Sequence, residues 1–420
     1  MSIFSSSRAR RVYGTVAAVG ASALILAGCS GGTTPSESSA PSADREDLTL
    51  SIGTVLPQTG ALSYLGPPEE AGVGLATAEI NEAAKGITVE VQYGDSGDPD
   101  NKAYETTVPK LLGSDVSALI GAASSGVTKL FLDQAVSAGV ITFSPANTSP
   151  DFTTWDDDNL YWRTAPSDLL QGEVLGNLIA EDGNQALGII YLNDAYGTGL
   201  EKVVNETFTA SGGEVVASES YNAGDTNFSA QVSTILAANP DAIAVIGFEE
   251  TSTIVPSFVN SGFDSSKFYF VDGNISQWGD DMPVSIEGSK GTQPGPVLAD
   301  DFQERLKAQW LEQGDGNELV DFNYAAESYD ATVLLALASL AANSTDPADI
   351  ASKLQEVSGG SGDGEKCDSF ADCADIILGG GTADYDGYSG GIGFDDAGDP
   401  TEASIGVFQY GADNTHTRVN

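Results

Sequence analysis

Strand-like and helix-like segments alternate along this chain, and the alternation runs twice. In the first run, apolar stretches rich in β-branched residues lie at 48–56, 87–93, 116–120 and 140–143. Between them, apolar residues recur at helical spacing at 70–84, 101–112 and 127–137. Because the strands read as continuous apolar runs, this order predicts a parallel sheet covered by helices on both faces.

The alternation restarts in the second half of the chain. Strands are predicted at 186–192, 214–220, 242–248 and 268–271, with helices at 198–211, 228–238 and 252–262. Later helices are predicted at 300–313, 324–342 and 347–357, and later strands at 392–394 and 403–410. A folded part of this length is too long for one compact core. We therefore expect an α/β fold with two Rossmann-like lobes.

The N-terminus has the pattern of an export signal. Three arginines precede an apolar run at 16–26, and small residues then lead to Cys29. The run is too short to cross about 30 Å of hydrocarbon. The ending Leu26-Ala27-Gly28-Cys29 resembles a bacterial lipobox, which implies cleavage of residues 1–28 and lipid on Cys29. An ordinary secretory signal that ends near a cysteine is the alternative.

A polar segment follows the predicted lipid site. Residues 30–43 are almost wholly Ser, Gly, Thr, Pro and Ala, so they cannot bury enough apolar surface to fold. We interpret 29–47 as a flexible tether. The nearest later candidate for a membrane span, at 334–342, is too short. The chain would thus be held at the outer face of the cytoplasmic membrane by lipid alone.

Charge and composition exclude several classes of function. The formal net charge is −44, and loss of three arginines with the signal would leave about −47. Nucleic acid is therefore excluded as a partner, because phosphate binding needs Lys and Arg. His416 is the only histidine, which argues against a His-based triad or a His metal site. No phosphate-loop sequence is present. We expect no enzyme activity, no cofactor and no metal.

Two cysteines remain near the C-terminus. Cys367 and Cys373 flank residues 368–372 in a polar, Gly-rich stretch. Outside the cell a disulfide is the expected state. A metal site is the alternative, but no further cysteine and no nearby histidine could complete it.

Six stretches together resemble one known family, although none of them is decisive alone. They are 52–60 (IGTVLPQTG), 95–99 (DSGDP), 121–126 (GAASSG), 143–148 (FSPANT), 193–197 (NDAYG) and 324–330 (YAAESYD). Their order and spacing resemble the branched-chain amino-acid-binding proteins of ABC importers, which are type I periplasmic binding proteins. The likeness covers nearly all of the chain after the tether.

The resemblance implies a particular architecture and working cycle. Two α/β lobes would be joined by a hinge of three chain segments and would close on a small solute. The closed form would then dock on a membrane permease, and relatives are commonly monomeric. We place the first lobe at 48–165 plus 290–395, and the second at 166–289 plus 396–420.

The first-lobe loops at the carboxyl ends of the strands are candidates for holding the solute. The loop that ends in Ser125 precedes a predicted helix, whose N-terminus can receive a carboxylate. Ser125 matches the carboxylate-binding serine of the family, although a cap of the helix is the simpler role. By the same resemblance, the Ala146 carbonyl and the Thr148 hydroxyl would meet the solute amine and carboxylate.

The second lobe would supply the remaining contacts. Tyr196 matches a tyrosine that faces the solute, and Phe248 is a candidate for an apolar wall. Tyr64 of the first lobe is a further candidate for an apolar wall. Where amino-acid-binding relatives place a glutamate for the ammonium group, this chain offers Asp272, with Glu249 as second choice. If neither acid reaches the cleft, a neutral amide, urea or an aromatic acid becomes the better solute.

These features together predict an extracytoplasmic solute-binding lipoprotein of an ABC importer that captures a small amino acid. Two alternatives remain open. One is a receptor that uses the same cleft for sensing, and the other is a hydrolase or cell-wall enzyme on a similar two-lobe frame.

Overall fold

The computed structural model describes residues 45–313 and 318–420. The predicted signal at 1–28, Cys29 and most of the predicted tether at 29–47 lie outside the described residues. Within the described ranges, no helix combines the length and apolar character that a bilayer span requires.

The first sheet is wholly parallel, as the first run of alternation predicts. Its order is β2-β1-β3-β4-β5. Four strands lie within a few residues of their predicted positions, and β5 was not predicted. The strands are β1 (Leu48–Val55), β2 (Ile87–Gln92), β3 (Ala118–Gly121), β4 (Ile141–Ser144) and β5 (Tyr161–Arg163). We call this sheet and the helices packed around it the first lobe.

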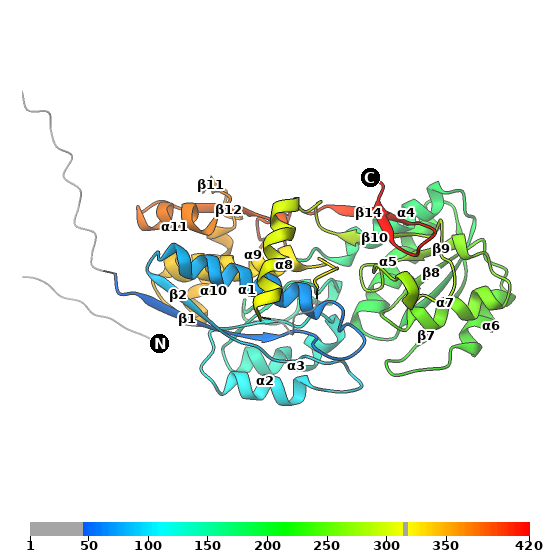
Figure 1. Cartoon of the computed structure of the whole chain (residues 1–420), viewed down its shortest axis with the longest axis horizontal. Helices are drawn as coiled ribbons and strands as arrows, with labels where there is room; N and C mark the ends of the chain where they lie inside the picture. The colour runs from blue at the N-terminus through cyan, green and yellow to red at the C-terminus, as the bar shows by residue number, and fades with distance from the viewer. Residues whose placement is uncertain (1–44, 314–317) are drawn as a thin grey trace, which may run out of the picture. The chain divides into compact units, whose positions relative to one another are not determined.

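Helices from distant parts of the sequence cover this sheet. From the N-terminal half come α1 (Gly66–Ala83), α2 (Tyr104–Leu112), α3 (Ser125–Ser137) and the short 3-10 helix η1 (Pro150–Thr154). From the C-terminal half come α8 (Asp300–Gln313), α9 (Ala325–Ala342), α10 (Pro347–Val357) and α11 (Phe370–Leu378). Figure 1 shows α1, α8 and α9 lying together, and α1 packs against both α8 and α9.

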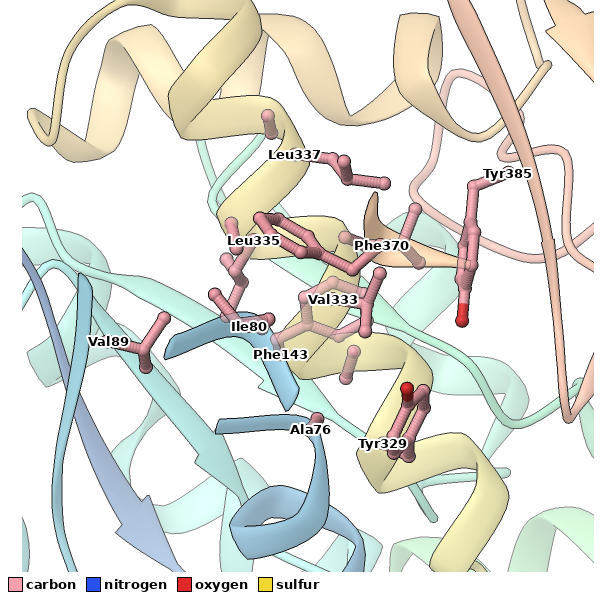
Figure 2. Packing of buried hydrophobic residues seen from close by; sticks show 14 of the residues in the cluster. Ala76, Ile80, Val89, Phe143, Tyr329, Val333, Leu335, Leu337, Phe370 and Tyr385 are labelled. Atoms are coloured by element: carbon pink, nitrogen blue, oxygen red, sulfur yellow. The ribbon is translucent and has the colours of Figure 1, made fainter. Parts of the chain in front are cut away.

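Helix α9 forms the centre of the first-lobe core. Every residue from Ala325 to Leu340 is buried, so the helix runs through the interior of the lobe and has no solvent-exposed face along this length. Its side chains, among them Tyr329, Val333 and Leu337, share one cluster with Phe143 of β4 and Phe370 of α11 (Figure 2). The late helices therefore return to the first lobe, as the resemblance implies.

The second sheet has the order β7-β6-β8-β9-β10-β14-β15 and is parallel except at β14 and β15. Its strands are β6 (Ala186–Leu192), β7 (Glu214–Tyr221), β8 (Ala242–Ile246), β9 (Phe268–Phe270), β10 (Lys290–Pro294), β14 (Ile405–Tyr410) and β15 (His416–Arg418). We predicted that the chain returns to the first lobe at residue 290. This boundary is too early, because β10 pairs with β9 and β14 and so belongs to the second sheet. The other lobe boundaries stay a prediction.

The helices of the second lobe follow the predicted pattern with one addition, α4, which the sequence did not reveal. They are α4 (Asp168–Glu181), α5 (Ala195–Ala210), α6 (Ser229–Ala237) and α7 (Thr251–Asn260). Two 3-10 helices are η2 (Ser265–Lys267) and η3 (Gly279–Asp281). The chain passes between the two large sheets three times: after β5, after β10 and before β14.

A small third sheet lies in the C-terminal part of the first lobe. It consists of β11 (Glu365–Cys367), β12 (Ala383–Gly387) and β13 (Gly390–Gly391). Cys367 and Cys373 form the expected disulfide beside it. The strand predicted at 392–394 is wrong, because Ile392 and Phe394 are buried in the first-lobe core and only an isolated bridge forms there.

Candidate functional site

A small cavity lies where residues from the carboxyl ends of strands in both lobes meet. About 10 Å³ of it is accessible to the centre of a water molecule, which is about what one bound water needs. No Lys, Arg or His of the described residues lines it. Its lining residues are Leu62, Leu65, Ala123, Ser124, Ser125, Ala146, Tyr196, Phe248, Asp272, Gly273 and Tyr324.

The N-terminus of α3 forms the first-lobe wall. The Ser124 hydroxyl accepts a hydrogen bond from the Val127 amide at 3.3 Å and so caps the helix. The Ser125 hydroxyl accepts from the amides of Thr148 and Ser149, both at 3.3 Å. Capping therefore falls to Ser124, while Ser125 joins the two candidate loops. The first amides of a helix lack intrahelical acceptors, so this wall offers hydrogen-bond donors to an anion.

A polar network fixes the second first-lobe loop against the first. The Ser144 hydroxyl donates to the Ala122 carbonyl at 2.7 Å and accepts from the Ala146 amide at 3.2 Å. The Asn147 side chain donates to the Ala122 and Ala123 carbonyls, both at 2.9 Å. Ala146 is thus positioned at the cavity by buried hydrogen bonds rather than by a flexible turn.

Asp272 follows β9 and lines the cavity, while its role as the partner of an ammonium group stays a prediction. Its carboxylate accepts from the Tyr196 hydroxyl at 2.6 Å, the Tyr324 hydroxyl at 2.5 Å and the Gln171 amide at 2.9 Å. Burial raises the pKa of Asp272, and these donors oppose that rise because they stabilise the charged form. Asp272 is therefore the better stabilised of the buried carboxylates here.

Asp168 is a second buried carboxylate that sequence reasoning missed. It is the first residue of α4, it is fully buried, and neither of its oxygens has a hydrogen-bond partner of ordinary geometry in the described residues. Burial raises its pKa well above the ordinary value, the charge of Asp272 raises it further, and the nearby Thr148 hydroxyl opposes the rise only in part. The pair thus favours one charge on Asp272 and a proton on Asp168.

Other buried acceptors near these acids are also unsatisfied. The Thr148 hydroxyl, the Gln171 side-chain oxygen and the Thr292 hydroxyl have no hydrogen-bond partner within the described residues. Asp168 donates its amide to the Thr148 carbonyl at 2.7 Å, and Gln171 reaches both Asp272 and the Thr292 carbonyl. Buried polar atoms without partners are rare in native proteins. Their concentration beside the cavity indicates a site for a polar guest.

Of the remaining predicted residues, Phe248 lines the cavity, and Tyr64, Thr148 and Glu249 lie around it. Phe248 stacks on Tyr196, with ring centroids 5.4 Å apart. Tyr64 donates its hydroxyl to the Asp272 carbonyl at 3.2 Å, and Thr148 lies behind the wall. Glu249 lies at the cleft mouth, where its amide donates to the Ala61 carbonyl of the first lobe.

The cleft mouth is strongly acidic. A space of about 680 Å³ there is lined by Tyr64 and by acids of both lobes, with no Lys or Arg among the described residues that line it. Those acids are Asp98, Asp100, Asp225, Glu249, Glu250 and Asp281. Glu249 is exposed, so the structure does not bring the second-choice acid into the cavity.

The described residues contain no cluster of His, Cys, Asp and Glu that could hold a metal ion. His416 lies in β15, away from the cavity lining. The site therefore offers binding groups of two kinds: helix-terminal donors at one end and buried carboxylates at the other.

Residues 49–369 match the family model described as periplasmic binding protein. The chain belongs to this family. The match covers more than half of the chain and includes both groups of cavity loops. Proteins of this family work outside the cytoplasm, which agrees with the export pattern of the N-terminus.

Curated relatives align over most of the chain. The chain is 26% identical, over 365 residues, to a chemotactic signal transduction system substrate-binding protein, BasB, of Halobacterium salinarum. That alignment covers 82% of this chain and 83% of the relative. A leucine-, isoleucine-, valine-, threonine- and alanine-binding protein of Pseudomonas aeruginosa is 25% identical over 378 residues, with 88% of this chain and 92% of the relative covered.

Solved structures support the two-lobe fold. A leucine-binding protein of Thermotoga maritima superposes with a TM-score of 0.70 at 22% identity, covering 88% of this chain and 98% of that one. A branched-chain amino acid binding protein of Streptococcus pneumoniae in complex with isoleucine gives 0.68 at 23% identity, with 88% and 99% covered. The predicted type I periplasmic binding protein fold is thus confirmed.

Proposed function

We propose that this chain is the solute-binding protein of an ABC importer and that it captures an amino acid with a small apolar side chain. One observation carries the proposal. Two buried carboxylates, Asp168 and Asp272, lie among buried polar atoms without partners, beside a cavity that no basic side chain of the described residues lines. A binding site of this composition needs a cation from the solute.

A primary ammonium group meets this need. It carries one positive charge and three donors, and charge-assisted hydrogen bonds are strong where water is excluded. Its arrival would let Asp168 ionise, since a nearby cation favours the charged form. A neutral amide, urea or an aromatic acid would bring no cation to the carboxylate pair, and the nearby Arg163 is already paired with Asp399. We therefore place these solutes second.

The carboxylate of the same solute would lie at the N-terminus of α3, near Ser124 and Ser125. The Ala146 carbonyl would accept from the ammonium group, and the Thr148 hydroxyl would donate to the carboxylate. In this arrangement the amino-acid backbone spans the two lobes, so that only a molecule with both groups satisfies both walls. Leu62, Leu65 and Phe248 would surround its side chain.

The size of the cavity favours a small side chain and requires motion. With the lobes as they stand, there is room for about one water molecule. Entry of an amino acid therefore needs the lobes to part. The P. aeruginosa relative is named for leucine, isoleucine, valine, threonine and alanine, and we infer a solute from this group.

Delivery and anchoring complete the proposal. The closed, loaded form would dock on a membrane permease and release its solute unchanged, with no chemical step. Lipid on Cys29 would hold the protein, as a monomer, at the outer face of the cytoplasmic membrane. These steps rest on the family and on the N-terminal sequence.

Sensing is a second candidate function. The H. salinarum relative is named as part of a chemotactic signal transduction system, and capture of the solute would be the same in both roles. Loss of uptake on deletion of the gene would favour transport, whereas intact uptake with a lost tactic response would favour sensing.

Calorimetry tests the binding step. The protein from Cys29 onward is titrated with the amino acids named above, with basic and acidic amino acids, and with acetamide and urea. We expect one clear binder among the small apolar amino acids, with Kd of about 1 μM or tighter. If only amides or urea bind, the proposed solute class is wrong.

A further inference from the structure

A second cavity lies on the other side of Tyr324 from the cleft. About 250 Å³ of it is accessible to the centre of a water molecule, against about 10 Å³ in the cleft cavity. This volume is near the lower end of small-molecule sites, roughly 300 Å³. The cavity adjoins the crossing after β10 and is lined by residues of both lobes. We call it the hinge pocket.

Glu327 gives the hinge pocket a buried acidic group. The residue is only 5% exposed, and a Cβ added to Gly295 of the crossing would lie 3.1 Å from its Oε1. Its backbone carbonyl accepts from Thr164, but no other described residue donates a hydrogen bond to its carboxylate. Burial raises the pKa of Glu327 to about 8, so its carboxyl holds a proton at neutral pH. A cation bound beside it would favour the ionised form.

Asp321 adds a second acid to the same wall. It accepts a hydrogen bond from the Asn323 amide at 3.0 Å, and burial raises its pKa to about 6. Both acids belong to the first-lobe side of the pocket, where they flank Tyr324 in the sequence. This wall therefore suits an ammonium group.

Arg418 supplies the opposite charge from the second lobe. It lies in β15, donates from Nη1 to the Gly295 carbonyl at 3.0 Å, and donates from Nε to Asn420 at 3.1 Å. It forms no salt bridge with an acid of the described residues, Glu327 included. Gly295 thus lies next to both an acidic side chain of the first lobe and a basic side chain of the second, which form no salt bridge with each other in the described residues.

The rest of the pocket is largely apolar. Phe322, Phe408 and Leu298 line it, and Val297 and Val320 are 75% and 69% exposed at its edge. Large exposed apolar side chains beside a hollow are typical of binding sites. A guest there would have an apolar part in addition to its charges.

We propose that the hinge pocket binds a small zwitterion, with its ammonium group toward Glu327 and its carboxylate toward Arg418. The guest would be an amino acid with an apolar side chain or a molecule of the same chemistry. This site is distinct from the cleft, because Tyr324 separates the two and is the only described residue that lines both. Its occupancy would bridge the lobes beside the crossing at Gly295.

Equilibrium dialysis of the protein from Cys29 onward tests the proposal with labelled L-leucine, L-alanine and glycine at up to about 10 mM. We expect two classes of site for at least one of them. Asp272→Asn should abolish the tighter class, and Arg418→Gln should weaken the other at least about tenfold. Arg418→Lys should keep part of that affinity.

Two further variants keep the test sharp. Glu327→Gln removes the acid on the first-lobe side of the pocket with little change of shape. It should weaken the same class of sites that Arg418→Gln weakens. Lys307→Gln is the matched control, because Lys307 lies over the Phe322 ring but outside the pocket lining. At most one bound equivalent for every probe would overturn the hinge site, as would a second class that survives both Arg418→Gln and Glu327→Gln. Failure of the cleft proposal shows separately, as a tight class that Asp272→Asn leaves unchanged.

Discussion

The Tyr324 hydroxyl donates a hydrogen bond of 2.5 Å to the Asp272 carboxylate and so joins the start of α9 to the end of β9. Tyr324 has φ +61, an uncommon left-handed conformation for a residue with a side chain. The bond links the two lobes at the cavity itself. Asp272 is therefore held by donors from both lobes, and any ammonium group must join or displace them.

Replacing Asp272 with Asn should abolish tight amino-acid binding. The change removes the better stabilised charge of the buried pair, and losing one partner of a buried charge pair costs about 2–5 kcal/mol. Calorimetry on the purified variant measures the loss. Asp280→Asn is the control, because Asp280 is an exposed acid of the second lobe. Equal affinity in the Asp272 variant and the wild type would remove Asp272 from the site.

Replacing Thr148 with Val should separate binding from stability. The Thr148 hydroxyl is buried near the Asp168 carboxyl but forms no hydrogen bond of ordinary geometry in the described residues, and a poorly satisfied buried group costs about 1–3 kcal/mol. The isosteric change should therefore raise the free energy of unfolding, or leave it unchanged, while it weakens solute binding. Thermal unfolding and calorimetry measure the two effects.

Thr142 provides the matched control for this prediction. Its hydroxyl is also buried without a partner in the described residues, but it lies in β4 and outside the cavity lining. Thr142→Val should stabilise to a similar degree and leave affinity unchanged. A Thr148 variant that binds as tightly as the Thr142 variant would show that the Thr148 hydroxyl does not contact the solute.

Many residues of this site could be predicted because they come directly after strands in the sequence. Ser125, Ala146, Tyr196 and Asp272 all come soon after apolar strands that the sequence marks clearly, and parallel strands present their carboxyl ends at one edge. Asp168 and Gln171 could not be found this way. Both lie in α4, and an acid in the first turn of a helix is too common to indicate a binding site. Only tertiary folding brings these two residues to Asp272.

The errors in the fold have a similar origin. β10 (Lys290–Pro294) contains Gly and Pro and has no apolar run, so its sequence reads as a turn. It is a strand because β9 and β14 bind it on both sides. Ile392 and Phe394 give the opposite case, since their apolar side chains fill the first-lobe core without a strand partner. The local sequence pattern therefore cannot show whether a segment pairs as a strand or only packs its side chains into the core.

Solute binding should release a proton. In the free protein, burial and the charge of Asp272 raise the pKa of Asp168, while Arg163 and the Thr148 hydroxyl oppose that rise, so the protonated form of Asp168 is favoured relative to an ordinary aspartate. A bound ammonium group favours the ionised form and lowers that pKa. Affinity should therefore rise with pH, by at most about tenfold per unit, below the raised pKa of the free protein. Calorimetry in two buffers of different ionisation enthalpy counts the proton, and Asp168→Asn should abolish the release. A pH-independent affinity in the wild type would contradict the shared-proton arrangement.

Replacing Asp399 with Asn should destabilise the protein far more than breaking an exposed ion pair. Arg163 of β5 is fully buried and donates to Asp399 at 2.5 and 2.8 Å, so this pair ties the first crossing between the sheets to the segment before β14. Loss of one partner leaves a buried charge unpaired, which costs about 3–5 kcal/mol. Asp375→Asn is the control, because the Lys85–Asp375 pair is exposed and such pairs contribute about 0–1 kcal/mol. Urea unfolding measures both. A similar small loss in the two variants would mean that the neutral amide introduced by Asp399→Asn still satisfies Arg163 and that the pair does not fix the crossing.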